Sequence, residues 1–352
     1  MSSTRPAPLP DFVGHGLVFI ASGGRVVTYS KPYLTLEQQV DLLEQRGLLV
    51  DRARALHAVE RVGYYRLSGY WYPYRRIDSA ESAARGRPVR ASEVVPGTRL
   101  DQVVALYDFD RRLKLLVMDA IERIEIALRV ELAYTLGARD PYVHRDPRAF
   151  DGRFSRPRPR RRQQESAHDE WLRKLAQLQT RSKEDFVAHF KDKYDGDLPI
   201  WVAVEVTDFG MMSILYEHTR RPTRDVIARK HSVTDESGAG NGEALANWLR
   251  VLNFTRNTCA HHARLWNRNF TDQVRASALA GIPDLAHIAG LDPRDQARLY
   301  PALAIIRHLL ATVAPGDDWS SRLVRLLDEF PADGVVSLSD MGLPDDWRAR
   351  LS

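Results

Sequence analysis

Two side chains near residue 260 have types and a spacing suited to chemistry on a phosphodiester. Arg256 and His261 lie in the stretch from Asn253 to Asn267, whose apolar and polar residues alternate with a helical period. At about 100° per residue, Asn253, Asn257 and His261 form one row, and Arg256 lies roughly 140° around the helix from His261. The long side chain of Arg256 can lean back toward that row, so we expect an imidazole, a guanidinium and a carboxamide within two turns of one helix.

These groups suit cleavage of an RNA backbone without a metal ion. A histidine side chain exchanges a proton near neutral pH, and it can serve the 2′-hydroxyl or the leaving 5′-oxygen. An arginine stays charged and stabilises the extra negative charge on the phosphorus in the transition state. One imidazole per chain is few for two proton transfers, and a dimer that faces two such helices would supply both.

A purely structural interpretation of the same row stays open at this point. A polar row on a helix is often a solvated face, in which Arg256 pairs with a carboxylate and His261 with a carbonyl oxygen.

Cys259 is the single cysteine, which excludes an intramolecular disulfide and is typical of a reducing compartment. His261 and His262 point apart on a helix, so they predict no zinc site, and we expect no metal and no other cofactor.

Composition predicts a soluble globular protein. The chain has 352 residues, of which 44% are hydrophobic and 28% charged, and a net charge of +5. It contains no apolar run of about 18 residues, so we expect no membrane helix and a cytoplasmic location. The positive charge slightly favours polyanionic partners. Most of the basic residues are arginine, which suits phosphate recognition but is also typical of a GC-rich genome.

The pattern along the chain predicts an all-α fold. Helices are expected at 36–46 after a capping box of Thr35 with Gln38, and at 52–62, 100–136, 168–180, 183–194, 199–218, 243–267, 293–313 and 318–330. Residues 77–97 are small, charged and punctuated by Gly and Pro, which indicates a linker. The expected organisation is an N-terminal extension (1–30), a small helical subdomain with its linker (31–97), a helical domain (98–335) with a basic loop at 151–165, and a C-terminal tail (336–352).

Two further segments are candidates for contact with RNA. Six arginines broken by prolines predict an exposed extended loop that could bind a phosphate backbone: Arg153, Arg156, Arg158, Arg160, Arg161 and Arg162. Near the N-terminus, Tyr64, Tyr65 and Arg66 open a segment of rings and guanidinium groups, which can stack on unpaired bases. Either segment also has an ordinary explanation, as a solvated loop and as the filling of an interface between subdomains.

Several spaced blocks, in this order, resemble the Abi-like (abortive infection, AbiD/AbiF) family of prokaryotic defence proteins within the HEPN superfamily. They are Lys31-Pro-Tyr-Leu-Thr, Gly63-Tyr-Tyr-Arg-Leu-Ser-Gly-Tyr70, Tyr107-Asp-Phe-Asp-Arg111, Leu198-Pro-Ile-Trp-Val-Ala-Val-Glu205, Phe209-Gly-Met211, Arg256-Asn-x-x-x-His261 with Ala263-Arg-Leu-Trp-Asn267, and Asp318-Trp319. The likeness runs from about residue 31 to residue 331. It implies an all-α, HEPN-like helical bundle, a fold thought to be related to the nuclease of RNA-targeting CRISPR effectors.

The resemblance also implies roles for particular residues. Arg256 and His261 would be catalytic with Asn257 placing the phosphate, while Glu205, His262 and Arg264 would support them. It implies a metal-independent endoribonuclease that leaves 2′,3′-cyclic phosphate ends, acts as a homodimer in antiphage defence or a toxin–antitoxin pair, and takes a structured small RNA as a further partner. A non-catalytic RNA-binding protein and a DNA-binding regulator built on the helices of residues 31–97 stay open as alternatives.

Overall fold

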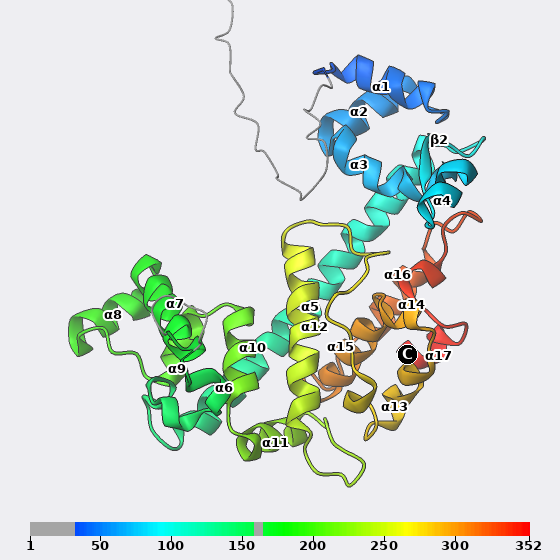
Figure 1. The fold of residues 1–352 in the computed structure, drawn as a ribbon. Helices are drawn as coiled ribbons and strands as arrows, with labels where there is room; N and C mark the ends of the chain where they lie inside the picture. Colours follow the sequence, from blue (N-terminus) through cyan, green and yellow to red (C-terminus); the bar gives the residue numbers. More distant parts are fainter. Residues whose placement is uncertain (1–31, 158–164) are drawn as a thin grey trace, which may run out of the picture.

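The structure, a computed structural model, describes residues 32–157 and 165–352, and this part of the chain is predominantly helical. Its longest element is α5 (Leu100–Gly137), which spans 38 residues and contacts helices from every other part of the fold (Figure 1). Of the apolar positions that indicate this helix, Leu116 is partly buried and the others are buried: Leu106, Phe109, Leu113, Ala120 and Ile124. The prediction of an all-α fold with one long central helix is therefore confirmed.

The N-terminal helices form a small unit at the start of α5. They are α1 (Leu36–Gln45), α2 (Arg52–Val62) and α3 (Tyr64–Trp71), and α3 packs on α5 (Figure 1). The capping box of Thr35 with Gln38 is present as predicted. Gly63 joins α2 to α3 with a φ of +89°, a conformation that glycine adopts without steric cost.

The segment predicted to be a linker is ordered, which corrects the sequence interpretation. It holds a short antiparallel sheet of β1 (Arg75–Ile77) and β2 (Arg90–Val94), with α4 (Ser79–Arg85) between the strands. Arg90 on β2 joins the two strands, because its guanidinium donates to the carbonyl oxygens of Pro73 and Arg75 at 2.7 and 2.6 Å. Strands of three and five residues are too short to give a clear period in the sequence.

The helices from residue 143 to residue 230 extend to one side of α5 (Figure 1). They are η2 (Val143–Arg145), η3 (Pro147–Ala149), α6 (Gly152–Ser155), α7 (Ala167–Arg181), α8 (Asp185–Tyr194), α9 (Ile200–Ala203), η4 (Val204–Val206), α10 (Phe209–His218) and α11 (Arg221–Lys230). The single helix predicted over 199–218 is divided into α9, η4 and α10. Asp208 starts α10 anew, since its carboxylate accepts a 2.7 Å hydrogen bond from the Met211 N–H.

The predicted motif helix is α12 (Gly242–Ala260), which packs between α5, α10 and α15. Its apolar face is buried as expected, with Trp248, Leu252 and Cys259 at most 4% exposed. The helix ends at Ala260 rather than continuing to Asn267. His261 is the C-cap, and His262 takes the left-handed conformation with a φ of +54°.

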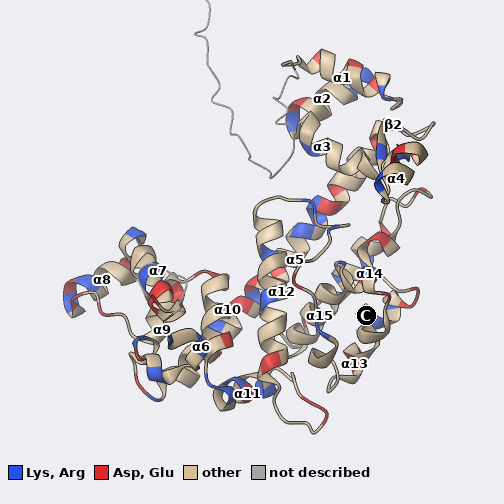
Figure 2. Ribbon diagram, viewed as in Figure 1, with Lys and Arg blue, Asp and Glu red and all other residues tan. Residues whose placement is uncertain are grey.

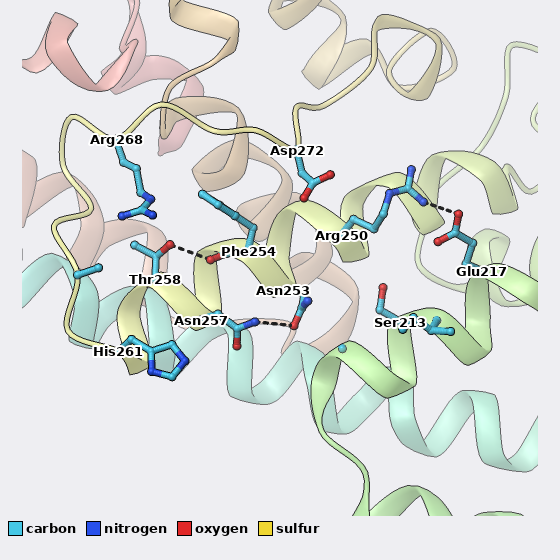
Figure 3. A pocket seen from close by; sticks show the side chains of 13 residues that line it. Ser213, Glu217, Arg250, Asn253, Phe254, Asn257, Thr258, His261, Arg268 and Asp272 are labelled. Carbon is cyan, nitrogen blue, oxygen red and sulfur yellow. Dashed lines mark hydrogen bonds and ion pairs between the residues drawn. The ribbon is translucent and has the colours of Figure 1, made fainter. Parts of the chain in front are cut away.

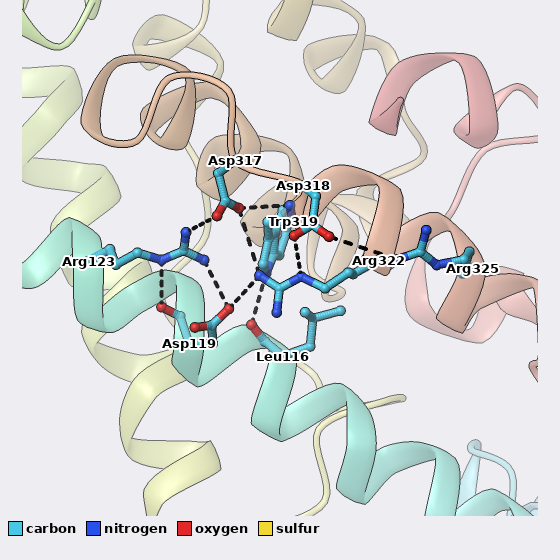
Figure 4. A network of polar contacts seen from close by, with 8 residues as sticks. All are labelled: Leu116, Asp119, Arg123, Asp317, Asp318, Trp319, Arg322 and Arg325. Atoms are coloured by element: carbon cyan, nitrogen blue, oxygen red, sulfur yellow. Dashed lines mark hydrogen bonds and ion pairs between the residues drawn. The ribbon is translucent and has the colours of Figure 1, made fainter.

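The C-terminal helices cover the opposite side of α5 and α12. They are α13 (Pro283–Ala286), α14 (Pro293–Gln296), α15 (Tyr300–Val313), α16 (Trp319–Asp328) and α17 (Trp347–Leu351), so the helix predicted over 293–313 is divided into α14 and α15. A network of ion pairs joins α16 to α5 (Figure 4): Arg322 lies 2.8 Å from Asp119, and the Trp319 indole N–H donates to the Leu116 carbonyl at 2.8 Å.

The predicted C-terminal tail is also part of the packed structure. A 3-10 turn (Leu338–Met341) precedes α17, and α17 contacts both α15 and α16. Met341 and Leu351 are fully buried, which explains why these residues are ordered. Among the described helices, none combines the length and apolarity needed to cross a bilayer.

Candidate functional site

The polar row of α12 faces a cavity between α12, α10 and the segment that follows α12 (Figure 3). The cavity has a volume of about 460 Å³, within the range of about 300–1,000 Å³ usual for ligand pockets. Asn253, Asn257 and His261 all line it, as the helical spacing predicts. His261 lies at one end, and an ion pair between Arg250 and Glu217 lies at the other.

The side chain of Asn257 contacts both Arg256 and Asn253. Its Oδ1 lies 3.5 Å from a terminal nitrogen of Arg256, and its Nδ2 donates to the Oδ1 of Asn253 at 3.3 Å. His261 is exposed, and no hydrogen bond of its ring occurs among the described residues. The imidazole is therefore accessible to a ligand in the cavity, and the Asn257 carboxamide that contacts Arg256 lines the same cavity.

Arg256 is half-buried on the side of α12 that faces α5 and the start of α10. The positive charge of Arg256 favours the ionised form of two carboxyl groups, Glu125 and Asp208. Burial raises the pKa of Glu125 overall, against the attraction of Arg129 and Arg256. Burial also opposes ionisation of Asp208, but hydrogen bonds from Lys174 and the Met211 N–H hold its pKa below the usual value.

Glu205, for which the resemblance implies a role in support of Arg256 and His261, lies next to a different arginine, Arg129. Its carboxylate lies 4.0 Å from Arg129, on a 3-10 turn that precedes α10, and it is half exposed. Arg129 in turn lies 2.6 Å from Glu125 and donates to the Thr207 carbonyl at 3.1 Å. The charge of Arg256 thus acts on Glu125 and Asp208, whereas Glu205 forms its ion pair with Arg129.

The two supporting residues after His261 act in a turn rather than on a helix. The His262 carbonyl accepts a 2.6 Å hydrogen bond from Arg66 on α3. Arg264 is largely buried, and its guanidinium donates to the carbonyl oxygen of Gly69, also on α3. Arg264, for which the resemblance implies a supporting role, thus joins the turn to the N-terminal unit.

A buried carboxylate on α5 binds the backbone of the same turn. Asp110 is fully buried, and it accepts hydrogen bonds from the backbone N–H groups of Leu265 (3.1 Å) and Trp266 (2.8 Å). The Tyr70 hydroxyl and the Lys114 ammonium also bond to this carboxylate, at 2.7 and 2.9 Å. Burial and the charge of Asp110 raise the pKa of Tyr70. Three of the sequence blocks that carry the resemblance therefore meet at one carboxylate.

The residues predicted to bind RNA divide into three groups. Tyr65 is 91% exposed, whereas Tyr64 is half-buried with its ring 5.0 Å from that of Trp71, so it fills an interface. Arg153 and Arg156 are exposed as expected, but Arg153 lies within α6 rather than in an extended loop, and it pairs with Asp151 at 3.3 Å. The remaining arginines lie outside the described residues: Arg158, Arg160, Arg161 and Arg162.

The cavity also holds residues that the sequence did not single out. Arg268 lines it with its guanidinium 5.3 Å from the ring centroid of Phe254, another lining residue. Arg268 follows the motif in an irregular segment, where no helical period points to it. The single cysteine is buried on α12, and burial raises the pKa of Cys259 to about 12, which suits packing rather than nucleophilic chemistry. Elsewhere basic and acidic residues are mixed along most helices (Figure 2).

The fold and this cluster define a predominantly helical protein with an exposed histidine and two carboxamides at one cavity, and with Arg256 in contact with one of the carboxamides. A scan against protein-family models matches the family described as Abi-like protein over residues 57–267, more than half of the chain. The chain belongs to the Abi-like protein family, and so to the abortive-infection type of protein. Searches of the curated proteins and of the solved structures gave no match.

Proposed function

We propose that this protein is a metal-independent HEPN endoribonuclease that acts in antiphage defence or in a toxin–antitoxin pair. The observation that carries the proposal is the exposed imidazole of His261 at a cavity that Asn257 also lines, with the Asn257 carboxamide in contact with Arg256. An exposed histidine beside an arginine with no carboxylate within 4.0 Å, among the described residues, is suited to a phosphodiester. The family match supports the defence context.

The proposed reaction needs no group beyond the protein and the RNA. The 2′-oxygen attacks the adjacent phosphorus as its proton passes to an imidazole, and the bond from phosphorus to the 5′-oxygen breaks. The leaving 5′-oxygen takes a proton from a second, protonated imidazole, which gives a 2′,3′-cyclic phosphate and a 5′-hydroxyl end. Arg256 would neutralise the charge that develops on the phosphoryl oxygens, and Asn257 would orient the phosphate.

The two proton transfers favour a homodimer in which each chain supplies one His261. The exposed face of α5 fits a second copy of this chain, since it carries a stripe of large apolar side chains at helical spacing. Leu115, Ile126, Val130 and Tyr134 are between 44% and 74% exposed along this face. The stripe borders Glu125 and Arg129, the charged residues next to Arg256, so a dimer formed on it would bring two candidate sites together.

The decisive experiment incubates the purified full-length protein with RNA in the presence of EDTA. We expect products that end in 2′,3′-cyclic phosphate, and a loss of at least about a hundredfold in rate for His261→Ala and for Arg256→Ala. His189→Ala, which removes an exposed histidine on α8, is the matched control and should cleave normally. Equal cleavage by the wild type and both site variants would exclude the catalytic assignment.

The same experiment separates the nuclease from a non-catalytic RNA-binding protein. The second function predicts that RNA is bound but stays intact in the wild type. RNA that copurifies with the protein can then be sequenced, and a single small structured species would identify the proposed RNA partner. The third function, a DNA-binding regulator, needs a free helix in the N-terminal unit. Arg66 and Gly69 of α3 are instead hydrogen-bonded to the turn after α12, which argues against that function.

A further inference from the structure

The cavity extends well beyond the group that would transfer protons. From His261 it follows α12 back to Arg250 (Figure 3), eleven residues or about 16 Å along the helix. A scissile phosphate beside His261 would fill one end only. The rest of the cavity is free to hold a nucleotide that neighbours the scissile phosphate.

Asn253 presents a hydrogen-bond donor to this space. Its Oδ1 accepts from Asn257, while its own Nδ2 makes no hydrogen bond with the described residues. Gly210 faces this carboxamide, and a Cβ at that position would lie 3.4 Å from the Asn253 Nδ2. The missing side chain at Gly210 therefore leaves room for the amide, which lines the cavity between Phe254 and Ser213.

Arg268 presents a cation at the same part of the cavity. Its guanidinium lies over the Phe254 ring, and no carboxylate is within 4.0 Å of it in the described part of the chain. Arg250, by contrast, is paired with Glu217 at 2.8 Å and is neutralised. A planar guanidinium without a carboxylate partner can bind a phosphate or stack on a base.

We propose that this part of the cavity is a nucleotide subsite for single-stranded RNA, in which Asn253 reads the base and Arg268 holds its phosphate. The Asn253 Nδ2 donates to a keto oxygen on the base edge, so the subsite prefers a keto base such as uracil to an amino base such as cytosine. This inference rests on the proposed function for its substrate class, because it takes the phosphate beside His261 to be the scissile one.

The test measures binding in a protein that does not cleave. Full-length His261→Ala is titrated with fluorescent oligo(U) and oligo(C) of eight nucleotides, two probes of equal charge and size. We expect oligo(U) to bind about fivefold more tightly than oligo(C), the effect of one hydrogen bond. Asn253→Asp, in the same background, replaces the donor by an acceptor of the same shape and should remove or reverse that ratio, even though its charge weakens both complexes.

Arg268→Ala should weaken both oligonucleotides equally and lower the slope of log Kd against log salt by about 0.7, the value for one contact to a single strand. Arg181→Ala on α7 is the matched control and should change neither quantity. An unchanged ratio of oligo(U) to oligo(C) affinity in Asn253→Asp, or an unchanged salt slope in Arg268→Ala, would overturn the subsite. Because no cleavage is measured, an inactive wild type would defeat the proposed nuclease without affecting these outcomes.

Discussion

Asp110 and Trp266 are 156 residues apart in the chain, yet the Asp110 carboxylate accepts a 2.8 Å hydrogen bond from the Trp266 N–H. The same carboxylate bonds to the Leu265 N–H, Tyr70 and Lys114. Asp110 thus fixes the backbone directly after His261 to the central helix and to α3. The position of the candidate catalytic histidine depends on a residue that lies outside the cavity.

Loss of this carboxylate should be costly for stability. Asp110→Ala leaves the Lys114 ammonium and two backbone N–H groups buried without their acceptor, so we expect a loss of about 3–5 kcal/mol in the free energy of unfolding. Tyr70→Phe removes only one hydrogen bond to the charge and should cost about 1.5–3 kcal/mol. Urea denaturation of both variants measures the difference. A smaller effect for Asp110→Ala than for Tyr70→Phe would contradict this role.

The turn itself gives a second prediction, because His262 has a left-handed backbone. A residue with a side chain costs roughly 1–2 kcal/mol in this conformation, whereas glycine is common directly after a helix C-cap. The Ala263 N–H bonds back to the Thr258 carbonyl at 3.0 Å, as in many helices that end with glycine. His262→Gly should therefore raise the free energy of unfolding by about 0.5–1 kcal/mol, measured by thermal or urea denaturation.

The same variant tests whether the His262 ring takes part in cleavage. The contact of this residue with α3 is made by its backbone carbonyl, which glycine retains. We expect His262→Gly to cleave RNA at the wild-type rate. A large loss of rate in a variant that is at least as stable as the wild type would instead give the second histidine a direct role.

A third prediction concerns the apolar stripe on α5. Val130→Asp places a charge in the middle of this stripe, so it should convert the proposed dimer to a monomer and reduce cleavage. Sedimentation velocity measures the oligomeric state, and the cleavage assay measures the rate. Val226→Asp, at an exposed valine on α11, is the matched control and should leave both unchanged. A wild-type protein that is monomeric at the concentrations of the assay would refute the composite site.

Sequence periodicity was sufficient for the helices that carry the site, and insufficient for where the motif helix ends. The long apolar rows predict both ends of α5 and the start of α12 to within a residue or so, and the polar row of α12 predicts which side chains share the cavity. The residues after Ala260 contain no Gly or Pro to stop a helix. The helix ends because Lys114, Asp110 and Arg66 bind the backbone of residues 262–266, contacts that only the tertiary fold supplies.

The acidic residues of the site show the same limit. In the sequence, Asp110 and Glu125 are two of many charged residues on a long helix, and nothing in their spacing distinguishes them from the others. Glu125 does pair with Arg129 four residues on, as local spacing allows. Its closeness to Arg256, and the burial of Asp110 under the turn after α12, arise from the packing of α12 on α5 and have no local signature.

A last prediction concerns pH and a histidine far from the cavity. His144 is fully buried beside Trp171, and neither of its ring nitrogens has a hydrogen-bond partner among the described residues. Burial, with the nearby charges of Arg145 and His168, lowers the pKa of His144 from 6.5 to about 4. Asp140 and Asp197 oppose this shift only in part. The folded protein therefore holds this imidazole neutral at a pH where the unfolded chain would bind a proton.

The sign of the effect on stability follows from that difference. Above pH 6.5 both states are neutral at this position and His144 has no cost. As the pH falls from 6.5 to about 4, the unfolded state gains a proton that the folded state excludes, so stability falls by about 3 kcal/mol in total. Urea denaturation of the wild type and of His144→Leu between pH 7.5 and pH 4.5, about the accessible range, measures it. The wild type should lose stability more steeply, since leucine does not titrate; parallel curves for the two proteins would show that His144 binds its proton equally well in both states.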